Sequence, residues 1–137
     1  MNHCHAQGIY HGDIYPENII IKESSGQIKL IDFGLSLAFT RGEQRASMDR
    51  PSATVEYDSE KEDLKALGAI LLTLVSGNQV ISIDKEDLNL QSEASLRNVS
   101  DECKDLIYRL LLGSPGDRVT AAKCLNHPWL KLHFPIP

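Results

Sequence analysis

The sequence predicts a mainly α fold of the α+β class, in which several helices accompany one β-hairpin. Residues 63–75 are apolar on nearly every side, which is typical of a helix buried among others. Residues 101–112 have the apolar spacing of an amphipathic helix. Two short runs rich in β-branched residues, 18–22 and 27–31, flank a loop that ends in Gly26, and this pattern predicts the hairpin. The length suits one domain, which we assign to residues 1–137.

The composition excludes several classes of protein. The net charge is −5, without a cluster of Lys or Arg, which argues against nucleic-acid binding through phosphate neutralisation. The sequence has no 18-residue apolar run and no signal peptide, so we expect no membrane contact. Cys4, Cys103 and Cys124 are scattered without metal-ligand spacing, as reduced thiols in the cytoplasm are. We therefore expect a cytoplasmic globular protein.

The N-terminal part is expected to contain the end of a helix followed by the hairpin. Residues 1–7 resemble the last turns of a helix, with Gly8 where a helix ends. Taking Ser25 as the centre of the hairpin turn pairs Asn18 with Asp32 at the open end of the hairpin. An amide and a carboxylate would then meet at the end of two apolar strands.

The remainder is expected to be one long loop and a set of helices. Residues 40–62 are polar and predict a surface loop, so we expect the charged stretch just before Asp63 to be solvated. The apolar helix should end near Gly77. Ser100 is placed to cap helix 101–112. In the same way, Thr120 should cap a last short helix that ends at Leu125.

Asp13, Asn18 and Asp32 are the candidates for chemistry. An Asn and an Asp can together hold a Mg²⁺ ion that also binds phosphate oxygens. A separate Asp a few residues away can orient an attacking hydroxyl and accept its proton. Two simpler interpretations remain open, because Asn18 and Asp32 could instead close the hairpin by a hydrogen bond, and Asp13 could cap nearby amides.

These residues lie in motifs that resemble those of protein kinases. The stretch HGDIYPENIII resembles the kinase catalytic loop HRDLKPENIL, and IDFGL resembles the metal-binding DFG segment. Four later segments resemble kinase motifs in the family's order: 54–57 the TPEY stretch, 63–68 the D-x-W-x-x-G helix start, 117–121 the D-x-R-x-T-A segment and 125–129 the L-x-HPW segment. Six motifs in the right order make coincidence very improbable, and the resemblance covers the whole chain.

The resemblance implies a role for each candidate residue. Asp13 would be the catalytic base, while Asn18 and Asp32 would be the Mg²⁺ ligands of a bound ATP or ADP. Ile20 would lie under the adenine, and the backbone at Glu17 would lie near the ribose. The chain would correspond to the C-terminal lobe of a kinase. The N-lobe, with its Gly-rich loop, lysine and glutamate, is missing, so tight nucleotide binding would need one.

Three further residues would support the site. His11 and Phe33 are expected to stack in the core behind it, and Asp63 is expected to hold the catalytic loop through backbone amides. Two positions depart from the family pattern, because Gly12 replaces the loop's Arg and Tyr15 replaces its Lys. The APE motif is also absent. These departures affect the transfer of phosphate rather than the binding of metal.

A narrower resemblance concerns one branch of the family. The shortened stretch before Asp63, the shortened stretch from Gly77 to Asp101 and residues 103–110 are similar to the kinase-homology region of RNase L. Relatives of RNase L include the unfolded-protein sensor kinase/RNase. A nuclease domain follows the kinase region in those proteins, and we expect none in this chain because it stops at Pro137.

Two functions from different classes follow. The first is a protein-kinase-like domain of the serine/threonine type that binds ATP or ADP with Mg²⁺, with phosphoryl transfer to protein in question. The second is an inactive pseudokinase lobe that acts as an interaction or dimerisation module of an RNase L-like protein. In either case we expect the exposed hairpin, including Ile20 and Leu30, to find a partner, either an N-lobe or a second copy.

Overall fold

The computed structural model describes residues 1–38, 59–77, 94–113 and 119–133. The described part is mainly helical with a small β component, as the sequence predicts. The α-helices are α1 Asn2–Ala6, α2 Ser59–Ser76, α3 Asp101–Leu112, α4 Ala121–Leu125 and α5 Pro128–His133, with short 3₁₀ helices at Pro16–Asn18 (η1) and Ala94–Leu96 (η2). The strands are β1 Ile9–Tyr10, β2 Ile19–Lys22, β3 Gln27–Leu30 and β4 Leu37–Ala38. The residues 54–57 and 117–118, which carry two of the kinase-like motifs, lie outside the described ranges.

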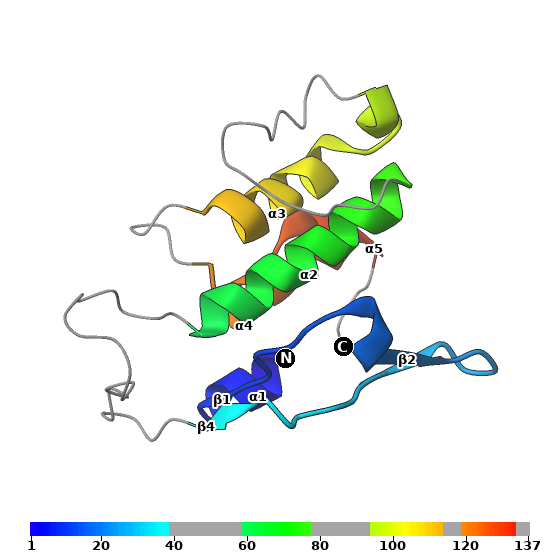
Figure 1. Cartoon of the computed structure of the whole chain (residues 1–137). Coiled ribbons are helices and arrows are strands. Elements are labelled where there is room, and N and C mark those ends of the chain that lie inside the picture. The colour runs from blue at the N-terminus through cyan, green and yellow to red at the C-terminus, as the bar shows by residue number, and fades with distance from the viewer. Residues whose placement is uncertain (39–58, 78–93, 114–118, 134–137) are drawn as a thin grey trace.

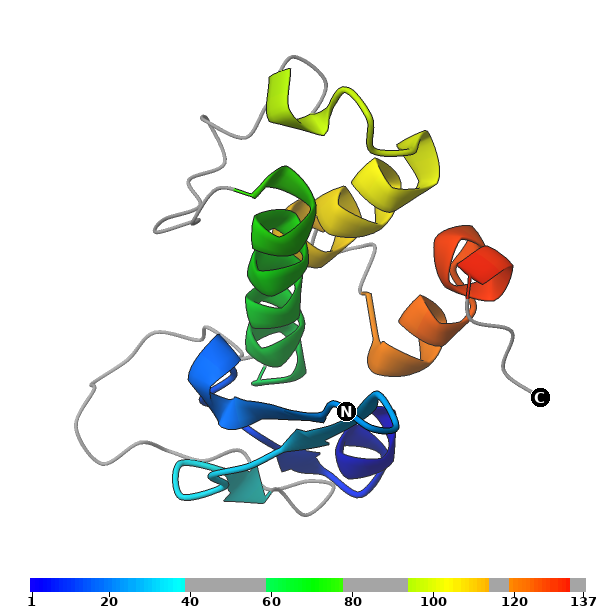
Figure 2. The same ribbon diagram turned by 90° about the vertical axis from the view of Figure 1, so that its right-hand side faces the viewer.

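The helices and the strands occupy separate parts of the molecule. Helix α2 runs beside α3, and the α4–α5 pair packs near them (Figures 1 and 2). Helix α1 and the strands β1 and β4 lie near the first turn of α2, whereas the β2–β3 hairpin extends away from it (Figure 1). The strands form two antiparallel pairs, β1 with β4 and β2 with β3. No helix in the described ranges is long and apolar enough to cross a membrane. The N-terminal segment therefore meets the helical part in two places, through β1 at α2 and through α1 at α4.

The core lies between α2 and α3. The buried side chains form two clusters on these helices and their neighbours: Leu72, Leu96, Cys103, Ile107 and Leu111 in one, and Leu64, Leu106, Leu110 and Ala121 in the other. Trp129 is partly buried against both clusters and so packs α5 onto α3, as expected. At Gly68 the two helices come so close that a Cβ atom there would lie 2.8 Å from Cβ of Leu110.

Helix α2 differs from the prediction at its start and in its burial. It begins at Ser59 rather than at residue 63, so the charged stretch that was expected to be a solvated loop forms its first turn. Ser59 and Asp63 are buried there. Leu74 is exposed, so the helix is buried along one stripe rather than on every side. The first turn is polar because it faces the N-terminal segment, which the local sequence does not reveal.

The predicted hairpin is present, but its predicted register was wrong by one residue. Ile20 pairs with Lys29, and not with Leu30. The loop contains four residues, because the Lys22 carbonyl accepts hydrogen bonds from the amides of Ser25 (3.1 Å) and Gly26 (2.8 Å). Gly26 adopts the left-handed φ of 66° that this turn needs. Leu30 is half-buried, whereas Ile20 is exposed as expected.

The predicted helix caps are confirmed. The Ser100 hydroxyl accepts from the Cys103 amide at 3.3 Å, and the Thr120 hydroxyl accepts from the Lys123 amide at 3.2 Å. Gly8 follows α1 with a φ of 71°. Helix α5 was not predicted, because Pro128 was interpreted as the end of the preceding helix, although a proline is well suited to the first position of a helix. The sequence analysis also missed the two-residue strands β1 and β4, which are too short to give a pattern.

Candidate functional site

The candidate catalytic loop is fastened to the first turn of α2. The amides of His11 and Gly12 each donate a hydrogen bond of 2.8 Å to Asp63, one to each carboxylate oxygen. Asp63 is buried, so these two bonds satisfy an anion that would otherwise be costly to bury. The prediction that Asp63 anchors the loop through backbone amides is confirmed.

His11 fixes the backbone on the other side of the loop. Its Nδ1 accepts from the Asp13 amide at 3.2 Å, so the ring proton lies on Nε2, which donates to the Ile31 carbonyl at 3.0 Å. The His11 ring is almost fully buried and lies 4.6 Å from the Phe33 ring, tilted by 58° rather than stacked. Phe33 is exposed in the described part of the structure, so the expectation that it lies in the core was wrong. His11 thus ties the loop to the end of β3.

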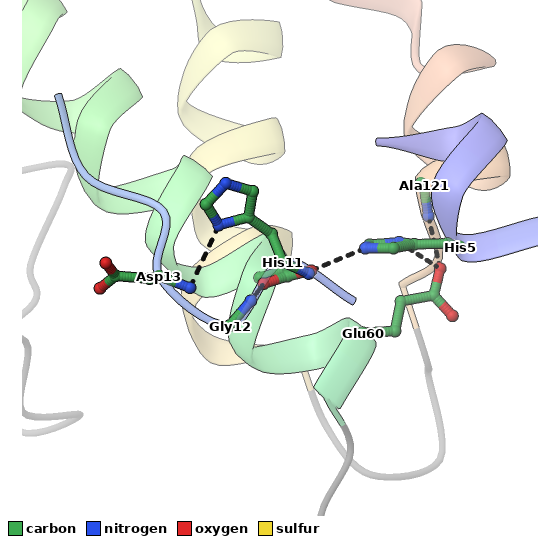
Figure 3. A network of polar contacts seen from close by, with 7 residues as sticks. His5, His11, Gly12, Asp13, Glu60 and Ala121 are labelled. Carbon is green, nitrogen blue, oxygen red and sulfur yellow. Dashed lines mark hydrogen bonds and ion pairs between the residues drawn. The ribbon is translucent and has the colours of Figure 1, made fainter. Parts of the chain in front are cut away.

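Asp13 and Asn18 lie together, as the sequence predicts. The Asn18 side-chain amide donates to the Asp13 carbonyl at 2.8 Å and to an Asp13 carboxylate oxygen at 3.1 Å. The Asp13 carboxylate points away from His5 and Glu60 (Figure 3). Asp13 is half-buried and its backbone is held on both sides, so a substrate hydroxyl could approach a well-positioned carboxylate.

Asp32 follows the end of the hairpin next to Asn18. The Ile31 amide donates to the Asn18 carbonyl at 2.9 Å, so Asn18 faces Ile31, and Asp32 is the next residue rather than the direct partner. Asp32 has a left-handed φ of 60°, although it is not glycine. This conformation costs about 1–3 kcal/mol, and such strain is concentrated at functional sites. Its Oδ1 accepts from the Gly34 amide at 3.1 Å, which helps to hold the turn.

The donor set at this end of the hairpin fits Mg²⁺. The side chain of Asn18 donates through its nitrogen, so its side-chain oxygen Oδ1 faces elsewhere and accepts no hydrogen bond within the described residues. Asp32 likewise has a second carboxylate oxygen that is not used among the described residues. Magnesium in phosphate sites commonly takes one or two protein oxygens and completes its shell with water and phosphate. No group of three His, Cys, Asp or Glu side chains in the described ranges offers a stronger metal site.

Ile20 and Glu17 are placed beside this end of the hairpin. Ile20 is exposed on the face of the hairpin that also carries its partner Lys29. Glu17 is exposed in η1, between the loop and β2. Both positions are compatible with the roles that the resemblance implies, and those roles stay predictions.

His5 and Glu60 form a polar network with Asp63 that the sequence analysis missed. His5 Nε2 lies 2.9 Å from Asp63 Oδ2, and His5 Nδ1 lies 3.4 Å from Glu60 Oε1 (Figure 3). The Ala121 amide, at the start of α4, donates to the same Glu60 oxygen at 2.9 Å. No sequence pattern could reveal these contacts, since they join residues far apart in the chain.

The network and the backbone amides control the ionisation of Asp63. Burial by itself would raise the pKa of Asp63, but the hydrogen bonds from His5, Gly12 and His11 outweigh burial and lower the pKa below its ordinary value. The carboxylate is therefore ionised at neutral pH. An ionised Asp63 can only accept hydrogen bonds, so His5 donates to it through Nε2.

The family is decided by comparison with known proteins. The family model for the protein kinase domain matches residues 1–130. The chain belongs to the protein kinase family. This match confirms the resemblance of the motifs to those of the protein kinase family.

Individual kinases align with nearly the whole chain. The SNF-related serine/threonine-protein kinase of Homo sapiens is 34% identical, with 100% of this chain and 20% of that protein covered. The serine/threonine-protein kinase PEPKR2 of Arabidopsis thaliana is 31% identical, with 95% of this chain and 31% of that protein covered. The solved twitchin kinase region from C. elegans is 26% identical, with a TM-score of 0.70 and coverage of 93% of this chain and 26% of that chain.

The chain thus spans about a fifth to a third of the length of these relatives. It has the kinase fold over the part that aligns, and its relatives are serine/threonine kinases.

Proposed function

We propose that this kinase-family chain binds Mg²⁺ together with the phosphates of ATP or ADP at Asn18 and Asp32. The observation that carries the proposal is the orientation of Asn18, whose side-chain nitrogen is held by Asp13, so that its side-chain oxygen is left without a hydrogen bond among the described residues. The backbone of Asn18 pairs with Ile31, the residue before Asp32. Bound Mg²⁺ would neutralise charge on the phosphates. Asp13 would lie beside the metal and accept a proton from an incoming hydroxyl.

The residues described here would bind nucleotide weakly. The adenine would contact Ile20 on one side only, and in this family we expect a second lobe to cover its other side. Affinity comes mostly from such burial of the ligand on both sides. In a calorimetric titration of this chain with Mg·ATP we expect weak binding or none, and a dissociation constant near ~1 μM would contradict this.

Phosphoryl transfer is proposed to be slow even where nucleotide binds. Tyr15, which is exposed, occupies the loop position where the family pattern has a lysine that steadies the transferring phosphate. Gly12 occupies the position of the loop's arginine, so a phosphorylated segment has no partner there. A neutral phenol cannot supply the positive charge that a lysine supplies to phosphate oxygens.

A weak metal site is best detected by paramagnetic Mn²⁺ used in place of Mg²⁺. Adding Mn·ADP to ¹⁵N-labelled chain should broaden the amide signals of Asn18, Asp32 and Gly34 first, because broadening depends steeply on distance. Asn18→Ala should weaken the effect. Glu102→Gln, which changes an exposed acid on α3, should not. Broadening centred on any other region, or none at these amides, would overturn the proposed site.

The second candidate is a pseudokinase lobe that acts as an interaction module of an RNase L-like protein, a placement that rests on the resemblance of residues 103–110. Two observations favour an interaction surface. Ile21 and Ile28 are paired across the hairpin and are 60% and 63% exposed, so one face of the hairpin is aliphatic and largely uncovered. Phe33 and Leu35 add exposed apolar area after β3. We propose that a second lobe or a second copy of the chain covers this hairpin.

One assay separates the two candidates. If the chain is a kinase-like domain whose only defect is the missing cation, Tyr15→Lys should increase phosphoryl transfer relative to the unchanged chain. If the chain is a pseudokinase, Tyr15→Lys should stay inactive but still bind the partner that the unchanged chain binds. The assay needs the chain together with whatever lobe completes its nucleotide site.

A further inference from the structure

Glu60 stands at the meeting point of three segments. It belongs to the first turn of α2, it accepts the amide of Ala121 from α4 at 2.9 Å, and it lies 3.4 Å from the His5 ring of α1. Its side chain is only 22% exposed, whereas that of Glu62 two residues later is 49% exposed and pairs with Lys65. The two glutamates on one helical turn thus have different surroundings.

The His5 ring transmits this contact to the catalytic loop. Its side chain is only 4% exposed, and its Nε2 donates to Asp63 Oδ2 at 2.9 Å. The same oxygen accepts the amide of His11 at 2.8 Å. The Tyr10 ring lies against the His5 ring, with centroids 5.2 Å apart. His5 therefore has little freedom to move without disturbing the Asp63 carboxylate.

The other nitrogen of His5 gives an independent observation. Nδ1 is buried and has no hydrogen-bond partner, which is uncommon for a buried polar atom and calls for an explanation. Glu60 Oε1 lies at ion-pair distance from Nδ1 but without hydrogen-bond geometry. The carboxylate is thus the polar group that faces this atom, and a protonated ring would have a carboxylate on each side (Figure 3).

We propose that Glu60 is a positioning residue that couples the start of α4 to the catalytic loop. It fixes Ala121 with its carboxylate oxygen and faces His5 with the same oxygen, and His5 in turn orients Asp63, which holds His11 and Gly12. The contacts thus run from the start of α4 to Glu60, from Glu60 to His5, from His5 to Asp63, and from Asp63 to the loop amides. This role concerns the shape of the loop and does not depend on nucleotide binding.

Amide hydrogen exchange, followed residue by residue by NMR, tests the proposal. In Glu60→Ala the amides of His11 and Gly12 should lose protection by roughly threefold to tenfold, the size expected for weakening one charge-assisted hydrogen bond. The amides of Ile107 and Leu111, in the core of α3, report global stability. A purely structural defect would lower protection at all four amides in step, and that result would overturn the proposal.

Two more variants sharpen the test. Glu62→Ala, the matched control, should leave the exchange of His11 and Gly12 unchanged. Glu60→Gln keeps an oxygen for the Ala121 amide but loses the charge that faces His5. Compared with Glu60→Ala, which removes the acceptor of the Ala121 amide, this variant should therefore regain exchange protection at Ala121 but not at Gly12. Restoration at both amides would refute the part of the coupling that is assigned to the charge facing His5.

Discussion

Gly12 shows why a single residue of the catalytic loop cannot simply be exchanged for the family's arginine. Its φ is +76°, a conformation that side chains rarely adopt, and a Cβ atom there would lie 3.1 Å from the Leu35 carbonyl oxygen. Gly26 has a similar φ of +66°, but a Cβ atom there would meet nothing within 4 Å. An alanine at either position would meet the strain of a positive φ, but only an alanine at Gly12 would also meet a close neighbour. Comparing the two variants therefore distinguishes the cost of crowding from the cost of strain.

We predict that Gly12→Ala lowers the free energy of unfolding more than Gly26→Ala does. Both variants meet the left-handed penalty of about 1–2 kcal/mol, and Gly12→Ala adds the close contact. Urea denaturation of the two variants measures the difference. Equal losses, or a smaller loss for Gly12→Ala, would show that the loop moves away from Leu35 easily.

Asp63 links the stability of the loop to pH. Its folded-state pKa is lowered, so the stability that it contributes is present above the ordinary Asp value of about 4 and is lost as the pH falls through the lower pKa of the folded state. Asp63→Asn should cost about 1.5–3 kcal/mol at pH 7, because two amides and His5 lose an anionic acceptor.

The difference between the original chain and Asp63→Asn should shrink as the pH falls below the ordinary Asp value of about 4, because there Asp63 binds a proton in the unfolded chain before it does in the folded one. The difference should be smallest below the lowered pKa of the folded state. Urea unfolding at several pH values measures it. Asp101→Asn, which changes an exposed carboxylate on α3, is the control and should show no comparable pH dependence. A constant difference between the original chain and Asp63→Asn would contradict the role of its charge.

At the scale of elements, Gly68 decides how closely α2 and α3 pack. A Cβ atom at this position would lie 2.8 Å from Leu110 Cβ and 2.9 Å from Leu111 Cδ2. Alanine at an ordinary helix position gains about 1 kcal/mol over glycine. We predict that Gly68→Ala nevertheless destabilises by roughly 1–3 kcal/mol, because overpacking outweighs helix propensity. A rise in the thermal midpoint would show that the two helices separate without cost.

The elements also show what the sequence can and cannot predict. Helix α3 and its cap at Ser100 follow from local pattern alone, since amphipathic spacing and an N-cap residue are both local features. The register of the hairpin changes by one residue when the turn gains or loses one residue. The pattern of β-branched residues does not determine the length of the turn. The first turn of α2 is polar because of contacts with distant segments, and here local reasoning predicted a loop.

The candidate site divides in the same way. Asp13 and Asn18 lie in one short motif, so their contact could be predicted, and the hairpin pattern predicted within one residue that Asp32 follows the partner of Asn18. His5 and Glu60 could not, because their contacts arise only when α1, α2 and α4 come together. Their discovery needs the folded chain.

At the scale of the whole molecule, the exposed hairpin should make the chain associate with itself. We predict that light scattering at rising concentration shows association and that Ile28→Lys reduces it, because a charge on the aliphatic face opposes burial. Leu132→Lys, at a side chain of α5 that is 71% exposed, is the control and should have little effect. A larger effect of Leu132→Lys would place the interface elsewhere, and a monomer at every concentration would contradict the predicted self-association.

The division of labour between Asp32 and Asp13 is the central claim, and thermal shifts induced by Mg·ADP test it most directly. The measurement uses high nucleotide concentration, or the chain joined to the lobe that completes its site. The shift should disappear in Asp32→Asn, because Asp32 would touch the metal in the ground state. It should remain in Asp13→Asn, because Asp13 would act only on the incoming hydroxyl. Loss in Asp13→Asn together with retention in Asp32→Asn would contradict the account.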